Sequence, residues 1–520
     1  MKVSLSTLKQ FLDLSLSAEE IGRLLTNLGI EVENIEFPKF SFSGVVVAKV
    51  LDTRQHPNAE RLKIATVFDG KEEFQVVCGA PNCRKDLITA FAKIGASLTD
   101  QEGKLWKIKK SKLRDIESHG MLCSSQELGF SSDHDGILEL SLDKELGKDL
   151  SCFYEDPIFE ISLTPNLGHC LSGLGIAREL AASLNQKVHL PSFTLQETCS
   201  TKPFNLTLDV ENPALCPYYK LRFMHQVKVG PSPSFIVQKL ASYGLKSVNN
   251  IVDCGNLVMM ELGQPLHIFD LDKIQGNRIR VTAQHSFSSL IALDEKEYAI
   301  PPSSLLICDE EKPLAFAGIM GSCSCAVDET TQNILIEAAF FEPSTIRKTS
   351  KITGLRSDSS YRFERGVDPQ GLDLALDYAL FLIQHYAEGY IDPSHTLSFD
   401  TAPFSPFRIS CRPAKINSLL GTNLSQGEMI DLLKRLEIHI HKIETDSLLL
   451  KIPSYRHDLK LEVDIAEEIA RLFGYHHIEK KEPKHISSSL PDTPLYTFEN
   501  HTREALLQEG LQECITCDLI

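Results

Sequence analysis

Apolar residues recur at helical spacing near the start of the chain. Residues 17–29, SAEEIGRLLTNLG, place apolar side chains three and four positions apart, which predicts a short amphipathic helix. Ser17 and Glu20 have the spacing of a capping box at the start of this helix, and Gly29 is a typical residue at its end. The chain therefore opens with a well-bounded helix.

Between residue 42 and about residue 147 the pattern changes to short runs of β-branched and apolar residues. The runs GVVVAKVLDT, LKIATVF, FQVVCGA and ITAFAKIGASL are separated by Gly, Pro and Asn turns. About five strands at this spacing predict a small barrel. Residues 104–114, KLWKIKKSKLR, add six basic side chains, no acidic one and Trp106, which favours an oligonucleotide-binding barrel. The alternative interpretation of this basic stretch is a solvated strand and turn surface.

Strands and helices alternate between residues 205 and 395, which predicts the largest α+β unit of the chain. A second capping box, Ser425 with Glu428, then begins a helix, and a further helix is predicted from about residue 463 to residue 473. With a strand between them, these helices predict a compact helix and wing unit. The last residues, HTREALLQEGLQECITCDLI, predict a helix followed by an unpaired strand, so we expect residue 520 to be a cut within a longer chain.

The net charge changes this picture in one respect. With 53 Lys and Arg against 70 Asp and Glu, the chain has a net charge of −17, which excludes a generally basic nucleic-acid coat. Any RNA contact must therefore use local basic patches. The first residues contain no apolar segment of signal-peptide type, and no run of about 18 apolar residues occurs, so we expect a cytoplasmic protein without a membrane partner.

The 14 cysteines follow no framework spacing, which in a chain of this length is typical of reduced thiols. Cys323 and Cys325, and the doublet His476 and His477, have side chains of the kind that bind zinc. However, no repeated CxxC pair completes a set of four ligands. We therefore expect no zinc site.

A series of motifs follows in a fixed order along the chain. The motifs are LLTNLGIEVE, HPNAERLKIATV, CGAPN, NPALCPYY, ELGQPLHIFDLDKI, LAFAGIMG, ILIEAAFFEP, GLRSDSSYRFERGVDP, PSYRHDL and EVDIAEEIARLFGY. As an ordered set they resemble one family, the β subunit of bacterial phenylalanine–tRNA ligase. Any one motif alone would be weak, but the set covers the whole chain and is specific.

The resemblance implies an enzyme subunit that works with a partner. In this family two α and two β subunits form a heterotetramer, and the α subunit holds the site where phenylalanine, ATP and the tRNA end react. The β subunit is expected to bind tRNA(Phe), to contact the α subunit and to hydrolyse tyrosine wrongly attached to the tRNA. Two alternatives stay open at this point: a free-standing tRNA deacylase, and a non-enzymatic scaffold that binds tRNA through the barrel.

On this resemblance the fold class is multidomain α+β, with six parts. They are an N-terminal helix and strand unit (1–38), a tRNA-binding oligonucleotide-binding-type β-barrel (39–148), a connector (149–204), a large α+β editing domain (205–396), a compact winged-helix-like domain with a magnesium site (402–478) and the start of a synthetase-like α+β module (479–520).

A second, hydrolytic site has a physical reason. Tyrosine is phenylalanine plus a hydroxyl, and an apolar pocket rejects an added hydroxyl only about a hundredfold. A site that removes the error needs an acceptor for the phenolic proton and a positioned water near the ester. The resemblance places the editing motif on Asn256, His267, Gly318, Gly321, Glu337, Ser357 and Ser359.

Glu337 is expected to accept a hydrogen bond from the tyrosine hydroxyl, and a hydrogen bond to a charged group contributes about 1.5–3 kcal/mol. His267 is expected to position the attacking water or the ester. Taken alone, a histidine after Pro-Leu is more typical of a structural role, and Glu337 is compatible with pairing to an arginine. Three positions depart from the family pattern: Ser357 and Ser359 replace an expected Thr and Ala, and Gly255 replaces an expected Thr, which puts the strength of editing in doubt.

Three carboxylates are expected on one face of the helix predicted near residue 463. Asp464, Glu467 and Glu468 are spaced i, i+3 and i+4, and Asp458 lies just upstream. Oxygen donors gathered in this way suit Mg²⁺. The resemblance assigns all four to a magnesium site shared with the α subunit, and the alternative is a solvated acidic start of a helix.

The resemblance also assigns a role in tRNA binding to the basic stretch of the barrel. Contacts to phosphates would give salt-dependent affinity that is largely independent of sequence. The candidates are Lys104, Lys107, Lys109, Lys110, Lys112 and Arg114. Near the editing motif, Arg356, Arg362 and Arg365 are expected either to hold the site in shape or to meet the tRNA backbone, and a structural role is favoured for Arg365 because Glu364 is adjacent.

Overall fold

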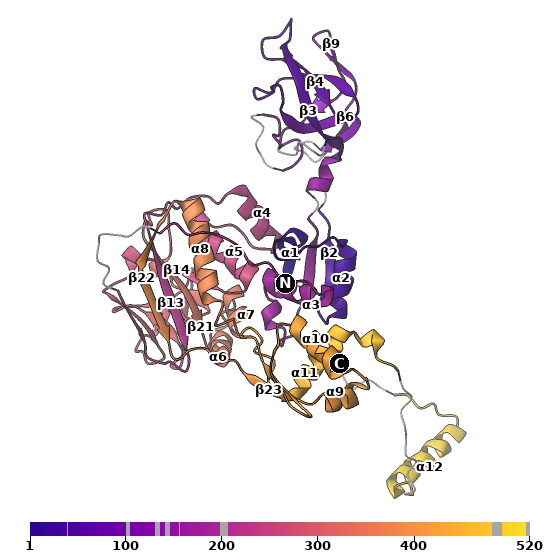
Figure 1. Cartoon of the computed structure of the whole chain (residues 1–520), viewed down its shortest axis with the longest axis vertical. Helices are drawn as coiled ribbons and strands as arrows, with labels where there is room; N and C mark the ends of the chain where they lie inside the picture. The colour runs from indigo at the N-terminus through magenta and orange to yellow at the C-terminus, as the bar shows by residue number, and fades with distance from the viewer. Residues whose placement is uncertain are drawn as a thin grey trace. The chain divides into compact units, whose positions relative to one another are not determined.

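The computed structural model divides the chain into two units, residues 1–475 and residues 476–520 (Figure 1). The residues that it describes are 1–38, 40–99, 104–130, 136–140, 146–154, 156–197, 206–480 and 491–515. The predicted mixed α+β, multidomain character is confirmed, while the exact domain boundaries stay predictions. Among the described residues, no helix has both the length and the apolar character needed to cross a bilayer.

The first sheet of the N-terminal region is antiparallel, in the order β1-β11-β2. The capping-box helix predicted at 17–29 is confirmed as α2, with Ser17 and Glu20 making both expected hydrogen bonds. The elements are β1 (Lys2–Ser4), α1 (Leu5–Phe11), α2 (Ala18–Asn27), β2 (Glu31–Glu36), β11 (Ile158–Ser162) and α3 (Gly173–Leu184). The segment predicted as a connector thus supplies the middle strand, β11, and the buried helix α3.

The barrel strands predicted between residues 42 and 147 are confirmed and are inserted in the chain between β2 and β11. The main sheet has the order β10-β6-β3-β4-β5, with β7 on β6, and β8 pairs with β9. The His119 amide donates to the Gln75 carbonyl at 2.8 Å, so the sheet curls until β5 meets the segment before β10. The strands are β3 (Ser43–Gln55), β4 (Lys63–Phe68), β5 (Glu73–Cys78), β6 (Ile88–Thr99), β7 (Leu105–Lys107), β8 (Ser111–Leu113), β9 (Ile116–Ser118) and β10 (Met121–Leu122).

The large α+β domain has two main sheets. A four-stranded antiparallel sheet has the order β14-β21-β13-β22, and a five-stranded sheet has the order β12-β15-β18-β19-β20. The strands are β12 (Thr207–Val210), β13 (Tyr218–His225), β14 (Leu266–Asp270), β15 (Arg278–Thr282), β16 (Ser289–Ile291), β17 (Glu297–Ala299), β18 (Leu306–Cys308), β19 (Pro313–Phe316), β20 (Met320–Gly321), β21 (Ile334–Phe340) and β22 (Tyr390–Asp400). The hairpin of β16 and β17 extends from this pair of sheets.

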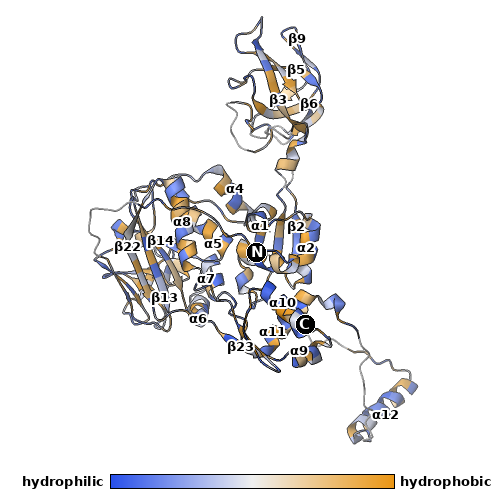
Figure 2. Ribbon diagram, in the orientation of Figure 1, coloured by the Kyte–Doolittle hydropathy of each residue, from blue (hydrophilic) through white to orange (hydrophobic). Residues whose placement is uncertain are grey.

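Alternating residues of β21 enter two different cores. Ile336 and Ala338 pack with α5 and α8 on one face of the four-stranded sheet, whereas Leu335 and Ala339 pack with the five-stranded sheet on the other. Figure 2 shows hydrophobic residues along α5 and α8. The helices of this domain are α4 (Ser234–Ser242), α5 (Asn250–Leu262), α6 (Pro343–Thr353), α7 (Asp358–Phe363) and α8 (Leu372–Ala387). Glu337 lies on the second face, inside the layer between the two sheets.

The predicted helix and wing unit is a three-stranded sheet, β23-β25-β24, with three helices. The second capping box is confirmed, since Ser425 and Glu428 make both hydrogen bonds at the start of α10. The elements are β23 (Arg408–Cys411), α9 (Pro413–Leu420), α10 (Gln426–Arg435), β24 (His439–Ile443), β25 (Leu448–Lys451) and α11 (Glu462–Phe473). Ile465 and Ile469 of α11 are fully buried in its core.

The second unit contains helix α12 (Pro494–Gln508). This helix begins seven residues before the predicted start at His501, because Thr493 caps it and Pro494 occupies its first turn. The strand predicted to follow it falls mainly on residues 516–520, which lie outside the described residues. The short 3₁₀ helices of the chain are η1 (Leu150–Phe153), η2 (Gly168–Cys170), η3 (Leu271–Lys273), η4 (Cys323–Cys325) and η5 (Tyr475–His477).

Candidate active site

A cavity of about 500 Å³ lies in the large α+β domain, and we call it the β21 cavity. All seven residues of the predicted editing motif line it. They are Asn256 on α5, His267 on β14, Gly318 and Gly321 around the turn from β19 to β20, Glu337 on β21, and Ser357 and Ser359 at the start of α7. The fold thus brings these separate segments of the chain to one enclosed space, and the chemical role of each residue stays a prediction.

Glu337 is the buried acid of the cavity. It lies in the middle of β21, opposite His267 of β14 and Leu221 of β13, with only 4% of the residue exposed. Burial raises the pKa of its carboxyl to about 8, and the nearby Tyr219 hydroxyl partly opposes this rise. Its Oε2 is buried without a hydrogen-bond partner among the described residues, and no arginine pairs with it there. The charged acceptor expected from the sequence is therefore mainly a neutral carboxylic acid at pH 7 in the free protein.

His267 is neutral for the same physical reason. Burial lowers the pKa of its imidazole to about 4, and its Nε2 is buried with no hydrogen-bond partner in the part of the chain that the structure describes. The ring packs edge-on against Phe269 at 4.4 Å between centroids. An imidazole of such low pKa is a weak general base at pH 7, but it is always available to accept or donate a hydrogen bond.

Two glycines leave the space that the cavity needs. A Cβ atom on Gly321 would lie 2.2 Å from Cε1 and 2.6 Å from Nε2 of His267. Gly318 has a φ of +67°, and a Cβ there would lie 2.8 Å from Phe341 and 3.0 Å from Phe363. Any larger residue at position 321 would have to displace the histidine ring.

The two serines have different surroundings. The Ser357 hydroxyl donates to the Ile319 carbonyl at 2.6 Å and accepts from the Ser360 amide at 3.0 Å, so it fixes the β19–β20 turn to the start of α7. The Ser359 hydroxyl has only a weak contact, 3.7 Å to the sulfur of Met259. Ser359 is therefore the serine whose hydroxyl can turn toward a ligand, while Ser357 shapes the wall.

The α5 wall holds two further positions that the sequence singled out. Asn256 lines the cavity, and a Cβ on the neighbouring Gly255 would make an ordinary contact of 3.4 Å with Ile268. Gly255 therefore leaves this part of the wall without a polar side chain, as the sequence indicated. A small side chain would fit there without strain.

The sequence did not identify the residues at the exposed side of the cavity. Val248 is 68% exposed, Leu293 is 47% exposed, and Asp294 follows Leu293 in the turn between β16 and β17. A hydrogen bond of 2.8 Å from the Tyr298 hydroxyl lowers the pKa of Asp294, so this carboxylate is charged at neutral pH. The only signal in the sequence was a polar turn between two short strands, which does not distinguish a cavity rim from any other hairpin.

The arginines near the motif are mostly structural. Arg362 is buried, and its Nε donates to the Leu171 carbonyl at 3.1 Å. Arg365 pairs with Glu364 at 2.6 Å and covers the ring of Tyr361, so the structural role expected for Arg365 agrees with its contacts. Arg356 is exposed. Of the three, only Arg356 has the exposure that a contact with RNA requires.

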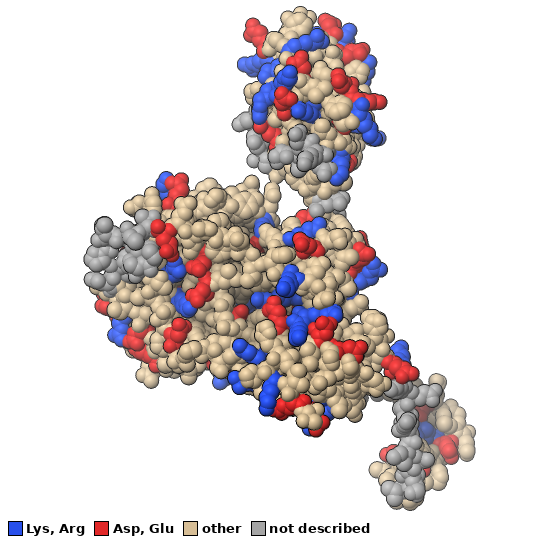
Figure 3. All heavy atoms as spheres, viewed as in Figure 1, with Lys and Arg blue, Asp and Glu red and all other residues tan. Residues whose placement is uncertain are grey.

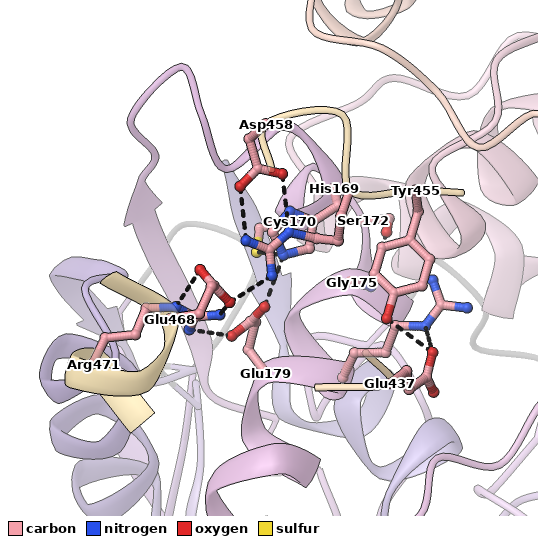
Figure 4. Close-up of polar contacts among 12 residues, drawn as sticks. His169, Cys170, Ser172, Gly175, Glu179, Glu437, Tyr455, Asp458, Glu468 and Arg471 are labelled. Atoms are coloured by element: carbon pink, nitrogen blue, oxygen red, sulfur yellow. Dashed lines mark hydrogen bonds and ion pairs between the residues drawn. The ribbon is translucent and has the colours of Figure 1, made fainter. Parts of the chain in front are cut away.

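Two of the four predicted magnesium ligands belong to a buried network of ion pairs (Figure 4). Arg456 donates to both oxygens of Asp458, at 2.9 and 2.7 Å, and to Glu468 at 2.7 Å. Arg471 binds Glu468 as well and also pairs with Glu179 of α3. Although burial opposes ionisation, the two guanidinium groups lower the pKa of Glu468 to about 2.

The four predicted carboxylates do not form one set of metal ligands. Asp464 accepts from two backbone amides at the start of α11, and Glu467 is exposed. Asp458 and Glu468 are already neutralised by arginines, because those side chains point inward from α11 and the preceding loop. The assignment of these four carboxylates to a magnesium site stays a prediction, and two of its members are paired with arginines in this structure.

A different group of possible ligands lies at the end of the same network. His169, Cys170 and Glu179 have ligand atoms within 4.8 Å of one another, and no other such group of three occurs among the described residues. Glu179 is already paired with Arg471, and burial raises the pKa of the Cys170 thiol well above its usual value. A bound cation would have to compete with the buried guanidinium groups of this network, so the donors do not fit a metal site.

The basic stretch of the barrel is exposed, as Lys104, Lys107, Lys109, Lys110, Lys112 and Arg114 all are. Several of these cations have local partners: Lys110 pairs with Glu117 at 2.8 Å, Lys112 with Asp115 at 3.8 Å, and Arg114 donates to a backbone carbonyl. Lys107, Lys109 and Trp106 line a groove of about 640 Å³ that also includes the CGAP segment at 78–81. Acidic and basic side chains are intermixed on the barrel face shown in Figure 3, so any basic surface is local.

Three family models match separate parts of the chain. Residues 45–149 match the family described as "Putative tRNA binding domain", residues 215–388 match the "B3/4 domain", and residues 409–475 match the "tRNA synthetase B5 domain". The phenylalanine–tRNA ligase beta subunit of Protochlamydia amoebophila is 48% identical over 520 residues, which is 100% of this chain and 65% of the relative. The corresponding subunit of Geobacter sulfurreducens is 40% identical over 518 residues, covering 99% of this chain and 64% of the relative.

Over its full length the chain is similar to phenylalanine–tRNA ligase beta subunits. It spans about 65% of the length of the curated relatives that it matches. A solved N-terminal fragment of the phenylalanyl-tRNA synthetase beta subunit from Pyrococcus horikoshii aligns at 14% identity with a TM-score of 0.39, covering 91% of this chain and 99% of the fragment. The residues that line the β21 cavity, including its seven motif residues, all fall within residues 215–388, which match the B3/4 domain.

Proposed function

We propose that this chain acts as the beta subunit of phenylalanine–tRNA ligase and that the β21 cavity hydrolyses tyrosine wrongly attached to tRNA(Phe). In this proposal an alpha subunit charges the tRNA with phenylalanine at the expense of ATP, in a heterotetramer of two alpha and two beta subunits. The observation that supports the editing role most is the enclosure of Glu337, His267 and Ser359 in one cavity of otherwise mostly apolar lining. An apolar space with a few converging polar groups is the usual form of a small-molecule site.

The inner end of the cavity suits a phenol. Glu337 is buried, and neither of its carboxyl oxygens is hydrogen-bonded among the described residues, so a ligand with a hydroxyl would satisfy a group that phenylalanine would leave unpaired. Discrimination on this basis can be much larger than an apolar pocket achieves. We therefore assign the tyrosine side chain to the end of the cavity near β21.

The outer end suits the charged and reacting parts of the substrate. The α-amino group of an aminoacyl ester is a cation at neutral pH, and Asp294 offers a charged carboxylate on the exposed side of the cavity. His267 is neutral and has a free ring nitrogen with which to hold a water molecule near the ester. We assign this water the role of nucleophile.

The reaction is a simple ester hydrolysis. The water oxygen bonds to the ester carbonyl carbon, and the bond from that carbon to the ribose oxygen breaks. One proton from the water ends on the ribose oxygen, and the other is released when the tyrosine carboxylic acid ionises. His267 positions the water by a hydrogen bond and, with its low pKa, is not expected to store the proton.

Mixing this chain with the matching alpha subunit tests the proposal. Glu337→Ala is expected to slow the hydrolysis of tyrosyl-tRNA(Phe) about tenfold or more, because one hydrogen bond to the phenol is lost. Charging with phenylalanine should be unchanged, since that reaction belongs to the alpha subunit. The exposed Glu329→Ala is a matched control in the same domain. If Glu337→Ala clears tyrosine as fast as the parent protein, the assignment of the cavity is wrong.

We further propose that the barrel contacts the tRNA backbone through Lys107 and Lys109 beside Trp106. Replacing both lysines by glutamate should weaken binding and should reduce the slope of log affinity against log salt by about two. Lys85→Glu, elsewhere on the exposed surface of the barrel, changes the charge without touching the groove. Equal salt slopes for the double variant and the parent would contradict the assignment.

We also propose that a magnesium ion shared with the alpha subunit is held by fewer than the four carboxylates expected from the sequence. Mg²⁺ is often held by one or two carboxylates and keeps several waters. Glu467 is exposed, and Asp464 is partly exposed at the start of α11, so these two are the candidates. The free-standing deacylase and the scaffold are not favoured, because the relatives are named as subunits of a ligase along the whole chain.

A further inference from the structure

The motif NPALCPYY ends in a tyrosine, Tyr219, that the proposed editing reaction has not used. Tyr219 is on β13, two residues from Leu221, and Leu221 is directly opposite Glu337 on β21. Because side chains alternate along a strand, Tyr219, Leu221 and Glu337 point to the same face of the four-stranded sheet. Diagonal neighbours of this kind are within reach of an aromatic side chain.

Tyr219 is fully buried, and its hydroxyl has no hydrogen-bond partner among the described residues. The hydroxyl lies close enough to Glu337 to lower the pKa of that carboxyl, although the two groups are not joined by a hydrogen bond of normal length. The ring itself packs against Phe341, which in turn contacts Phe363 in the cavity wall. Tyr219 therefore lies behind Glu337 and does not line the cavity.

A buried phenol and a buried carboxyl without partners are unusual neighbours, because each unsatisfied group costs free energy. The two groups would satisfy each other if the carboxyl rotated slightly and became ionised. A carboxylate has two oxygens, so one would remain for the ligand. A substrate phenol on that oxygen would then complete a symmetric arrangement of two phenol donors on one anion.

We propose that Tyr219 is a positioning residue for tyrosine recognition: its hydroxyl donates to Oε2 of Glu337 when a substrate phenol donates to Oε1, and the two donors hold Glu337 as an anion. This inference rests on the proposed editing function. Phenylalanine brings no second donor, so Glu337 keeps its proton and the arrangement does not form. Recognition of the phenol is thereby coupled to the release of one proton from Glu337.

The other groups near Glu337 are compatible with this coupling. His267 faces it from β14 and is neutral, and the buried thiol of Cys216, whose pKa is raised by burial, also stays neutral. Burial, and then the neighbouring Glu337, raise the pKa of Tyr219 well above its usual value, so Tyr219 remains a donor. Asp294 is the other carboxylate of the cavity lining and lies on its exposed side. No cation of the cavity lining competes to neutralise Glu337.

The pH dependence of tyrosyl-tRNA(Phe) hydrolysis by the complex with the alpha subunit tests the proposal. The rate at subsaturating substrate should rise with pH through about 8, as Glu337 ionises. In Tyr219→Phe the midpoint should move up by about one pH unit, because a donor to the anion is lost. Tyr218→Phe removes a hydroxyl from the neighbouring residue on the opposite face of β13 and should leave the midpoint unchanged. A midpoint that is the same in Tyr219→Phe and the parent would overturn the proposal.

A measurement on the parent protein separates this inference from the proposed function and does not depend on the folding of a variant. Carbon-13 NMR of the Glu337 carboxyl gives its pKa directly, and free tyrosine should lower that pKa whereas phenylalanine should not. The phenol carbon of Tyr219 should shift with the same midpoint. If tyrosine binds and the complex hydrolyses tyrosyl-tRNA, but the Tyr219 signal does not follow Glu337, only the role of Tyr219 is wrong. If neither hydrolysis nor tyrosine binding occurs, the editing assignment fails. The pH titration of Glu337 then still tests the pairing, and a Tyr219 signal that stays unchanged during this titration overturns it.

Discussion

Burial moves Glu337 and His267, the two buried ionisable groups of the β21 cavity, toward neutrality from opposite sides. It raises the pKa of Glu337 to about 8 and lowers that of His267 to about 4, because the charged form of each loses its hydration. In the proposed editing reaction the cavity admits an aromatic side chain, and a neutral lining favours its entry. The charge needed for recognition then depends on what the ligand donates.

The raised pKa of Glu337 has a consequence for stability. Between about pH 4.5 and about pH 8 the folded protein holds the Glu337 proton and the unfolded chain does not, so the free energy of unfolding falls as pH rises through this window. Glu337→Gln should remove this part of the pH dependence. Urea unfolding at pH 5.5 and at pH 8 measures it, with Glu329→Gln as the exposed control. Equal losses in the parent and in Glu337→Gln would contradict the prediction.

At the scale of elements, the sequence predicted those features that depend on local pattern. The capping boxes at Ser17 and Ser425 and the barrel strands are local, because the residues that define them are close together in the chain. The start of α12 was missed, since its signal is a single Thr-Pro pair in a polar stretch. Enclosure of the motif in one cavity was inferred from a resemblance, because no local pattern shows which loops meet.

The partners of buried charges were the least predictable feature. Asp458 and Glu468 have the residue type and spacing of metal ligands, but their oxygens are taken by Arg456 and Arg471. Arg471 in turn reaches Glu179, which is 292 residues away in the sequence. Such contacts follow from the packing of α3 against the helix and wing unit. No periodic pattern of residues in the sequence indicates this packing.

The turn from β19 to β20 provides a test at this scale. Gly321→Ala should reduce tyrosyl-tRNA hydrolysis by about tenfold or more, because its Cβ would occupy the space of the His267 ring, and a displacement of about 1 Å at a reacting group is costly. Gly427→Ala in α10 is the matched control, since a Cβ there meets only Ser425 Oγ at 3.9 Å. Editing assays and circular dichroism on both variants compare activity with folding. Full activity in Gly321→Ala would show that His267 need not keep its position.

At the scale of the first unit, buried ion pairs connect the N-terminal region to the helix and wing unit. Glu179 of α3 binds His169 at 2.8 Å and pairs with Arg471 of α11, which binds Glu468. Replacement of a whole buried pair by apolar residues is often tolerated, whereas removal of one partner leaves a buried charge. The network therefore makes the two regions dependent on each other for stability.

Arg471→Met should lower the free energy of unfolding by about 3–5 kcal/mol, because Glu179 and Glu468 would each lose a buried partner. Arg412→Met removes an exposed arginine in the same domain and should lower the free energy of unfolding much less, because exposed ion pairs contribute little. Thermal and urea unfolding of both variants give the comparison. A loss for Arg471→Met no larger than that for Arg412→Met would mean that the network contributes little.

The position of the barrel in the chain has a consequence of a different kind. Glu36 at the end of β2 is directly opposite Ile158 at the start of β11, so the polypeptide leaves the N-terminal sheet and returns to it on adjacent strands. Adjacent strands are about 4.8 Å apart, a gap that a two-residue hairpin turn closes. We therefore expect that another module whose two ends lie close together could replace the barrel without a change in the register of the strands that remain.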